Sequence, residues 1–190
     1  MRRLIGNPNL KAKAILIFAL LVMSIRGSAQ TETKRQVVVS LPDRKLVLLE
    51  GGEVKKIYPV AVGRSGSPSP TGTFQVVVRL ENPTYYHPGK VIGPGASNPL
   101  GNRWIGLNQK GYGIHGTNEP RSIGKAASHG CIRMAKADLE ELFTLVSVGD
   151  EVEIRGERDE QTAQWFGEPA VVLAKADVPA TQAAIAGAQQ

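Results

Sequence analysis

The residues best suited to chemistry lie in one short stretch, SHGCIR, at positions 128–133. It contains Cys131, the only cysteine among 190 residues, and His129, while a second histidine, His115, lies upstream. A lone cysteine forms no disulfide within its own chain, so its thiol remains free as a nucleophile. A nearby imidazole can accept the thiol proton, and the resulting imidazolium lowers the pKa of the thiol. The stretch therefore predicts nucleophilic catalysis by Cys131.

Two histidines could serve as the base. His129 is two residues from Cys131, and the glycine between them permits many geometries. His115 ends the apolar segment GYGIH and is separated from the cysteine by a loop. A base that meets the sulfur through space usually comes from elsewhere in the fold, which favours His115.

The neighbours of the cysteine suggest two supporting functions. Gly130 lets the backbone turn so that consecutive N–H groups converge on one point, and such donors beside a nucleophile form an oxyanion hole. Arg133 carries a planar guanidinium that suits a substrate carboxylate. A structural salt bridge is an equal alternative for Arg133.

Other interpretations stay open on residue types alone. A buried lone cysteine is often a small hydrophobic residue, and a histidine is often a hydrogen-bonded core residue. A metal site built from His115, His129 and Cys131 would need a fourth ligand or a water, and neither a second cysteine nor a closely spaced carboxylate is at hand. A redox function lacks a resolving cysteine. We expect no metal and no other cofactor.

A mainly β domain is predicted to position these residues. Segments rich in β-branched residues alternate with Pro-Asp, Gly-Gly and Gly/Ser/Pro turns, which is typical of strands. The predicted strands are residues 37–41, 45–50, 54–63, 73–80, 104–108, 112–116 and 151–155.

Two loops and one helix complete this domain. Loop 63–72 is rich in glycine, serine and proline, and loop 81–102 is too long to be a mere connector, which is typical of a functional loop. From Ala135 to Val146 the apolar residues recur at i, i+3, i+4 and i+7, which predicts a helix packed on the core. These apolar residues are Leu139, Leu142, Phe143 and Val146.

The two ends are expected to lie outside the domain. Residues 1–29 predict a signal peptide, because four basic residues precede the apolar run 14–25 and small residues surround a cleavage site after Ala29. The run is shorter than the roughly 20 residues that span a bilayer; an uncleaved membrane anchor is the alternative. The Sec and twin-arginine export routes both stay open. Residues 156–190 show no sustained period and predict a flexible tail, apart from docking by Trp165 and Phe166.

Charge argues against a nucleic-acid partner. The whole chain has a net charge of +6, but residues 1–29 hold five of its 23 basic residues and none of its 17 acidic ones. The remainder has 18 basic and 17 acidic residues, a net charge of +1. A clustered basic face, which nucleic-acid binding requires, is therefore not supported.

At these residues the sequence resembles the L,D-transpeptidases of the YkuD type. Their signature is a histidine followed by Ser/Thr-His-Gly-Cys, an apolar residue and Asn or Arg; here it is His115 and then SHGCIR. Three further blocks are similar: VGRSGSPSPTGTF (62–74), NPLGNRWIGL (98–107) and VSVGDEVEI (146–154). Ser69 stands where threonine is commoner. The resemblance covers roughly residues 34–155, which we expect to form the catalytic domain.

The resemblance implies a β-sandwich or barrel, with one or two short helices packed against it, and a reaction on peptidoglycan. Cys131 would attack the bond between the L-centre of a diamino acid and D-Ala in a tetrapeptide stem, releasing D-Ala. An amine would resolve the acyl-enzyme, giving a 3→3 cross-link or lipoprotein attachment. The alternatives are carboxypeptidase activity with water, or a wall-binding protein without turnover.

The resemblance also implies roles for the remaining site residues. His115 would be the base, oriented by the backbone carbonyl of Gly116. The backbone of His129, Gly130 and Cys131 would form the oxyanion hole. Ser128 and Arg133 would contact substrate. The expected partners are peptidoglycan stem peptides and a wall-linked lipoprotein, with a membrane touched only through an uncleaved leader. The expected location is the periplasm or cell wall.

Overall fold

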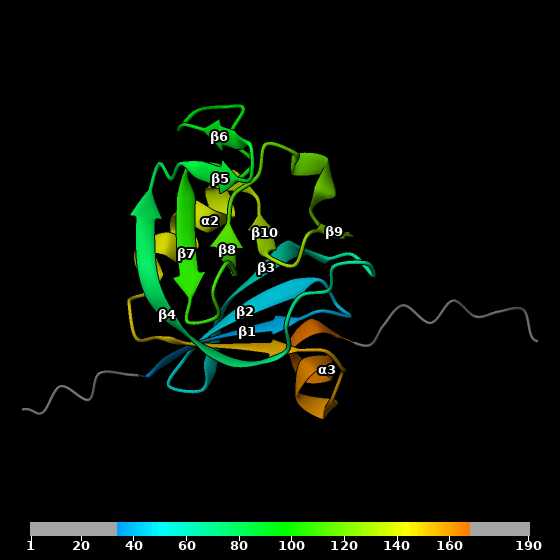
Figure 1. Ribbon diagram of the computed structural model, residues 1–190. Helices are drawn as coiled ribbons and strands as arrows, with labels where there is room; N and C mark the ends of the chain where they lie inside the picture. Colours follow the sequence, from blue (N-terminus) through cyan, green and yellow to red (C-terminus); the bar gives the residue numbers. More distant parts are fainter. Residues whose placement is uncertain (1–33, 168–190) are drawn as a thin grey trace, which may run out of the picture. The chain divides into compact units, whose positions relative to one another are not determined.

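The computed structural model describes residues 34–167 (Figure 1). The predicted signal peptide, 1–29, and the end of the predicted tail, 168–190, lie outside the described residues. The strands are β1 (Arg35–Ser40), β2 (Lys45–Glu50), β3 (Glu53–Gly63), β4 (Gly72–Glu81), β5 (Tyr85–His87), β6 (Lys90–Ile92), β7 (Arg103–Leu107), β8 (Gly113–His115), β9 (Ala126–Ser128), β10 (Ile132–Met134) and β11 (Glu151–Arg155). The helices are α2 (Lys136–Leu145), α3 (Glu160–Phe166) and the short 3-10 turn η1 (Pro120–Ser122).

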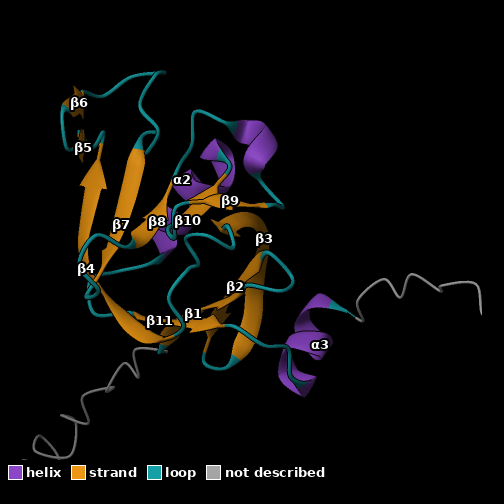
Figure 2. Cartoon of the chain, turned by 45° about the vertical axis from the view of Figure 1, so that its right-hand side comes forward, coloured by secondary structure: helices purple, strands orange, loops and turns teal. Residues whose placement is uncertain are grey.

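Nine of these strands form one sheet that closes on itself. Its order is β10-β8-β7-β4-β11-β1-β2-β3-β9, and β10 also pairs with β3. Most neighbours are antiparallel, but β1–β11, β8–β10 and β3–β9 are parallel. Strands β5 and β6 form a separate hairpin that stands above the ends of β4 and β7 (Figures 1 and 2). The prediction of a mainly β, barrel-like fold is confirmed.

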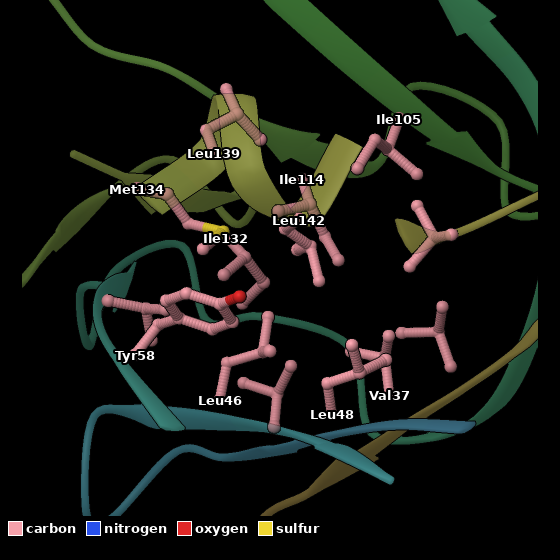
Figure 3. Close-up of a cluster of buried hydrophobic side chains, with 14 of the residues drawn as sticks. Val37, Leu46, Leu48, Tyr58, Ile105, Ile114, Ile132, Met134, Leu139 and Leu142 are labelled. Carbon is pink, nitrogen blue, oxygen red and sulfur yellow. The ribbon is translucent and has the colours of Figure 1, made fainter. Parts of the chain in front are cut away.

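The interior of this sheet is the main hydrophobic core (Figure 3). Val37, Leu46 and Leu48 of β1 and β2 face Ile114 and Ile132 of β8 and β10. Burial of side chains of this size stabilises the fold by about 1.5–3 kcal/mol each. The strands that carry the candidate site are therefore anchored by the core itself.

Helix α2 covers this core from the side of β7 and β8 (Figure 2). Its apolar face is buried as the periodicity predicted, and the residues that form it are Leu139, Leu142, Phe143 and Val146. The chain then turns at Gly149, whose φ of 96° suits a residue without a side chain, and enters β11.

The outer face of β1 and β2 is buried as well. Val38, Val47 and Leu49 point away from the main core and pack against Trp165 and Phe166 of α3. Burial on both faces explains why the middle of each strand, residues 37–39 and 46–49, is a continuous apolar run without alternation.

Helix α3 corrects the expectation of a flexible tail from residue 156. The helix begins with a capping box, in which the Asp159 side chain accepts the Thr162 N–H and the Thr162 side chain accepts the Asp159 N–H. A helix of seven residues makes only about two turns, which is too few for its apolar pattern to be recognised in the sequence. Packing on β1 and β2 stabilises it. None of the helices within residues 34–167 is long and apolar enough to cross a bilayer.

Candidate active site

Cys131 lies in a tight loop that joins β9 to β10, and its side chain is half-buried. Ser128 organises this loop from a fully buried position. Its hydroxyl accepts the N–H of Gly130 at 3.0 Å and donates to the carbonyl of Cys131 at 2.5 Å. Since both hydroxyl bonds are made within the loop, Ser128 acts on its shape. This differs from the substrate contact that the sequence analysis expected.

Glycine is required at position 130. Its φ is 117°, in the region that disfavours side chains. A Cβ there would lie 2.7 Å from Cε1 of Tyr112, so the tyrosine ring also occupies the space that a side chain would need. The loop can therefore turn sharply beneath Tyr112 just before Cys131.

Loop 63–72 supports the cysteine loop from the other side. Gly63 pairs with Ser128 across β3 and β9, and the Arg64 N–H donates to the Ser128 carbonyl at 3.1 Å. Ser69, which stands where the family more often has threonine, accepts the Gly63 N–H at 2.9 Å through its hydroxyl. The serine hydroxyl thus makes this bond itself, and the departure affects only the loop.

His115 reaches the same face of the sheet from the neighbouring strand. In the parallel pair β8–β10, Ile114 lies opposite Ile132 and His115 lies opposite Arg133. Both isoleucines are buried in the core. Because side chains alternate along a strand, His115 and Cys131 share the opposite face, separated by about one strand spacing sideways and two residues lengthwise.

The hydrogen bond of His115 determines which nitrogen can act as the base. Its Nδ1 lies 2.6 Å from the carbonyl of Gly116. A carbonyl only accepts, so Nδ1 carries the proton and Nε2 presents a lone pair. Gly116 therefore orients the imidazole as the resemblance implied.

Burial keeps the His115 imidazole neutral. The side chain is only 5% exposed, and burial lowers its pKa to about 4, against the opposing effect of the Gly116 carbonyl. The positive charge of Arg133 lowers the pKa further. At neutral pH the imidazole is thus a base that is ready to accept a proton.

The Cys131 thiol is also neutral at rest. Burial raises its pKa, while the backbone of Gly113 and the charge of Arg133 act in the opposite direction with smaller effect. The thiol donates to the Gly111 carbonyl at 3.5 Å. The sequence analysis expected a thiolate stabilised by an imidazolium. The structure instead has a neutral thiol beside a neutral imidazole, because both groups are desolvated.

The remaining predicted residues lie around this pair. The Gly130 N–H is already bonded to Ser128, so it is not free to stabilise an oxyanion. His129 is exposed. Arg133 is bonded to Glu119 at 2.9 Å, the salt bridge that was the alternative to substrate binding.

The long loop 81–102 closes over the far side of Gly116. Asn98 is fully buried and its side-chain amide donates to the carbonyls of Pro83, Ile92 and Gly93, which ties the loop together. Beside it lies a hollow of about 440 Å³. The hollow is lined by polar residues that include Asn82, Asn102, Thr117 and Lys136.

Two aromatic residues at the site were not singled out from the sequence. Trp104 stacks on His115, with ring centres 5.6 Å apart and planes at 23°. Tyr112 covers Gly130. Both belong to predicted strand segments. The strand register shows that Trp104 lies beside His115, and the packing at Gly130 shows that Tyr112 lies over the cysteine loop. Within residues 34–167 no three His, Cys, Asp or Glu side chains are grouped so as to hold a metal ion.

Comparison with known proteins identifies the family of this domain. The L,D-transpeptidase catalytic domain model, YkuD, matches residues 34–154. The Bacillus subtilis protein YqjB, named as an L,D-transpeptidase, is 41% identical over 121 residues, which cover 61% of this chain and 68% of the relative. YkuD of Bacillus licheniformis, also named as an L,D-transpeptidase, is 42% identical over 119 residues, 63% of this chain and 64% of the relative.

A solved structure shows the same fold. The L,D-transpeptidase from Mycobacterium smegmatis superposes with a TM-score of 0.56 at 24% identity, over 65% of this chain and 59% of its own. This chain thus spans only about two thirds of the length of the relatives that it matches. The family match covers more than half of the chain and includes both His115 and Cys131. The chain belongs to the YkuD family and carries an L,D-transpeptidase catalytic domain.

Proposed function

We propose that this protein is a peptidoglycan L,D-transpeptidase in which Cys131 is the nucleophile and His115 the base. The observation that supports this most directly is the register of β8 and β10, which sets His115 opposite Arg133 and so on the same face as Cys131, the residue just before β10. The Nδ1–H of His115 is held by Gly116, so its free Nε2 is the nitrogen that can take the thiol proton. Family membership supports peptide stems of peptidoglycan as the substrate class.

The proposed acylation begins from the neutral pair. Nε2 of His115 accepts the thiol proton as Sγ of Cys131 attacks the carbonyl carbon between the diamino acid and D-Ala. The imidazolium then gives the proton to the departing D-Ala amine, the C–N bond breaks, and a thioester remains. The N–H groups of Cys131 and His129 are the candidates to stabilise the oxyanion, since that of Gly130 is occupied.

The proposed second step returns the enzyme to its resting state. An amine of a second stem, or a lysine of a lipoprotein, attacks the thioester carbonyl while His115 takes its proton. The C–S bond breaks, and Sγ recovers a proton from the imidazolium. Water in place of the amine would give carboxypeptidase activity by the same route.

Acylation by a carbapenem tests the nucleophile. An L,D-transpeptidase of the same fold has been solved in complex with imipenem. Residues 30–190 should gain the mass of one imipenem, with the adduct on Cys131. Cys131→Ala should fold normally but gain no adduct and release no D-Ala, because a methyl group cannot attack a carbonyl. D-Ala release by the alanine variant would disprove the assignment.

The acceptor requires a separate experiment. The protein would be incubated with muropeptides that carry tetrapeptide stems, with and without a lipoprotein whose terminal lysine is free. Cross-linked dimers indicate a stem acceptor, a lipoprotein adduct indicates attachment, and tripeptides alone indicate water. Recovery of intact muropeptides bound to the protein would favour wall binding without turnover.

We also propose that the protein works outside the cytoplasm, in the periplasm or at the cell wall, where its proposed substrate lies. The basic and apolar pattern of residues 1–29 supports export. The N-terminal sequence of the protein recovered from the host tests this. We expect it to begin at Gln30, whereas a chain that retains Met1 would indicate an uncleaved anchor.

A further inference from the structure

Two rows of residues cross the sheet on the face that carries the catalytic pair. In the first row, Leu80 of β4 lies opposite Trp104 of β7, and Trp104 lies opposite His115 of β8. In the second row, Val78 lies opposite Gly106, and Gly106 lies opposite Gly113. The register of β8 and β10 places Cys131 next to Gly113 at the end of the second row. The two glycines leave a trough between Val78 and Cys131.

The indole of Trp104 fills this trough. A Cβ on Gly106 would lie 2.6 Å from Nε1 of Trp104, and a Cβ on Gly113 would lie 2.7 Å from its Cζ2. Both distances are far shorter than van der Waals contact, so the indole lies flat across the two glycines. A side chain at Gly106 would press on the indole and on Val78, and one at Gly113 would press on the Ile105 carbonyl and on the indole.

One face of this seated indole is turned to the base. Trp104 stacks on the imidazole of His115 with ring centres 5.6 Å apart. The imidazole is also held at Nδ1 by the Gly116 carbonyl. One hydrogen bond leaves a ring free to swing about that bond, whereas a stacked partner fixes its plane. The two contacts together determine the direction of Nε2.

We propose that Trp104 is a positioning residue for His115, and that Gly106 and Gly113 are the seat that holds its indole against the imidazole. The indole keeps Nε2 directed at the Cys131 thiol and keeps water away from the ring. This inference rests on the proposed function of His115 as the base.

The groups around His115 determine whether its imidazole is protonated. On the β10 side, Arg133 lies opposite His115 and is the charged group that acts on its pKa. Glu119 is bonded to Arg133, and Cys131 lies two residues before it. Arg133 disfavours the imidazolium, and the neutral thiol of Cys131 adds no charge. Burial is the largest cause of the lowered pKa of His115. The stacked indole covers one side of the ring, so it should contribute to this exclusion of water.

The first test needs no activity. The Cε1–H signal of His115 is followed by NMR against pH in the wild type, Trp104→Phe and Trp104→Leu. Phenylalanine keeps a flat face on the imidazole, so the pKa should stay near the wild-type value. Leucine keeps apolar bulk but leaves part of the trough open, so the pKa should rise towards about 6.5. An unchanged pKa in a folded Trp104→Leu protein would overturn the inference.

The second test measures imipenem acylation in the same variants. A misdirected base should slow acylation roughly 10- to 100-fold in Trp104→Leu, and the acid limb of its pH profile should move upward with the pKa. Gly106→Ala should have the same effect in a protein that retains Trp104, because the only atoms that its Cβ meets within 3 Å belong to the Trp104 and Val78 side chains. Rates and profiles that match the wild type in both variants would count against the proposal.

The matched control is the other tryptophan of the chain. Trp165 packs on the outer face of β1 and β2, away from the catalytic pair, so Trp165→Leu should leave the His115 pKa and the acid limb unchanged. An equal shift in Trp165→Leu would mean that general loosening explains the effect, and the inference would fail. If His115→Ala is acylated at the wild-type rate, the assignment of His115 as the base fails. The NMR titration would still decide whether Trp104 determines the pKa of the His115 imidazole.

Discussion

Cys131 and His115 rest as neutral partners because the protein removes water from both. A protonated thiol reacts slowly with electrophiles and oxidants, since the thiolate is the reactive form. In the proposed mechanism the thiol becomes a nucleophile only as its proton moves to His115, when a carbonyl is in place to be attacked. The site therefore favours reaction with a bound substrate over reaction with whatever diffuses past.

This arrangement predicts the effect of removing the base. In His115→Ala the alkylation of Cys131 by iodoacetamide should show a thiol pKa that is no higher than in the wild type, because no imidazolium stabilised the thiolate at rest. Imipenem acylation should nevertheless fall about 10²–10⁴-fold, since the proton acceptor is gone. The control is His129→Ala, which removes an exposed ring. A thiol pKa that rises clearly in His115→Ala would show that the resting pair is an ion pair.

The acid limb of activity is a second prediction for this pair. His115 has a pKa of about 4, so the fraction of neutral imidazole grows as the pH rises through 4 and is nearly complete by pH 6. The rate of imipenem acylation should follow that curve. An acid limb centred near 6.5 would indicate a solvated histidine and contradict the buried geometry.

Ser128 provides a third prediction at the scale of single residues. Its hydroxyl satisfies a donor and an acceptor inside the cysteine loop. Ser128→Ala leaves both unpaired and should cost about 1–3 kcal/mol of unfolding free energy. It should also slow acylation, because Cys131 is less firmly held. Urea unfolding and imipenem mass shifts measure the two effects, with the exposed Ser147→Ala as the control. A variant equal to the wild type in both would show that the loop does not depend on this hydroxyl.

The sequence predicts a catalytic pair, but it does not predict the protonation state of the two side chains. His115 and Cys131 follow from residue type, motif and spacing. Whether they carry charge depends on how much water reaches them, and burial is a property of the folded sheet. Trp104 was missed for the same reason, because its partner His115 is eleven positions away and only the antiparallel register brings the rings together.

At the scale of elements, the two faces of β1 and β2 pack against different parts of the molecule. The inner face builds the core beneath β8 and β10, while the outer face receives α3. The continuous apolar runs of these strands were a sign that both faces are covered. The sequence predicted the longer strands and α2, because their patterns of apolar and β-branched residues extend over enough positions to be recognised. It missed β5 and β6, which form a hairpin inside the predicted loop 81–102, and β9 and β10; each of the four has only three residues. It also missed α3, which depends on tertiary contacts.

The docking of α3 leads to a stability prediction. Trp165→Ala removes a large side chain from the cluster with Val38, Val47 and Leu49. Because this side chain is only partly buried, the unfolding free energy should fall by about 1–3 kcal/mol, less than for a fully buried tryptophan. Urea denaturation measures the loss, and the exposed neighbour Gln164→Ala is the control. Acylation by the folded fraction should not change. An equal loss in both variants would mean that α3 contributes by its backbone rather than by this contact.

At the scale of the whole molecule, the buried neutral His115 links activity to stability. Its pKa is about 4 in the folded protein and about 6.5 in an unfolded chain. A group whose folded pKa is lowered contributes its full stabilisation above the unfolded value and loses it as the pH falls. Acid should therefore destabilise the folded protein over the pH range that leads down to protonation of the His115 imidazole.

The expected loss is about 3 kcal/mol between pH 6.5 and pH 4. His115→Gln, which cannot take up a proton there, should lose less stability over that range. Thermal unfolding of both proteins at closely spaced pH values measures the difference. Parallel curves for the two proteins would show that His115 is not the group responsible.

The parallel pairing of β8 with β10 has a consequence for recognising distant relatives. The placement of His115 beside Cys131 follows the hydrogen-bond register, with Ile114 opposite Ile132, rather than the length of the chain that connects the two strands. Residues could be inserted before β9 without moving either reactive atom, whereas a shift of one residue in the pairing would turn the histidine into the core. A search pattern with a fixed histidine-to-cysteine gap would overlook such insertions. A pattern that anchors each reactive residue to its buried isoleucine and leaves the gap open would retain them.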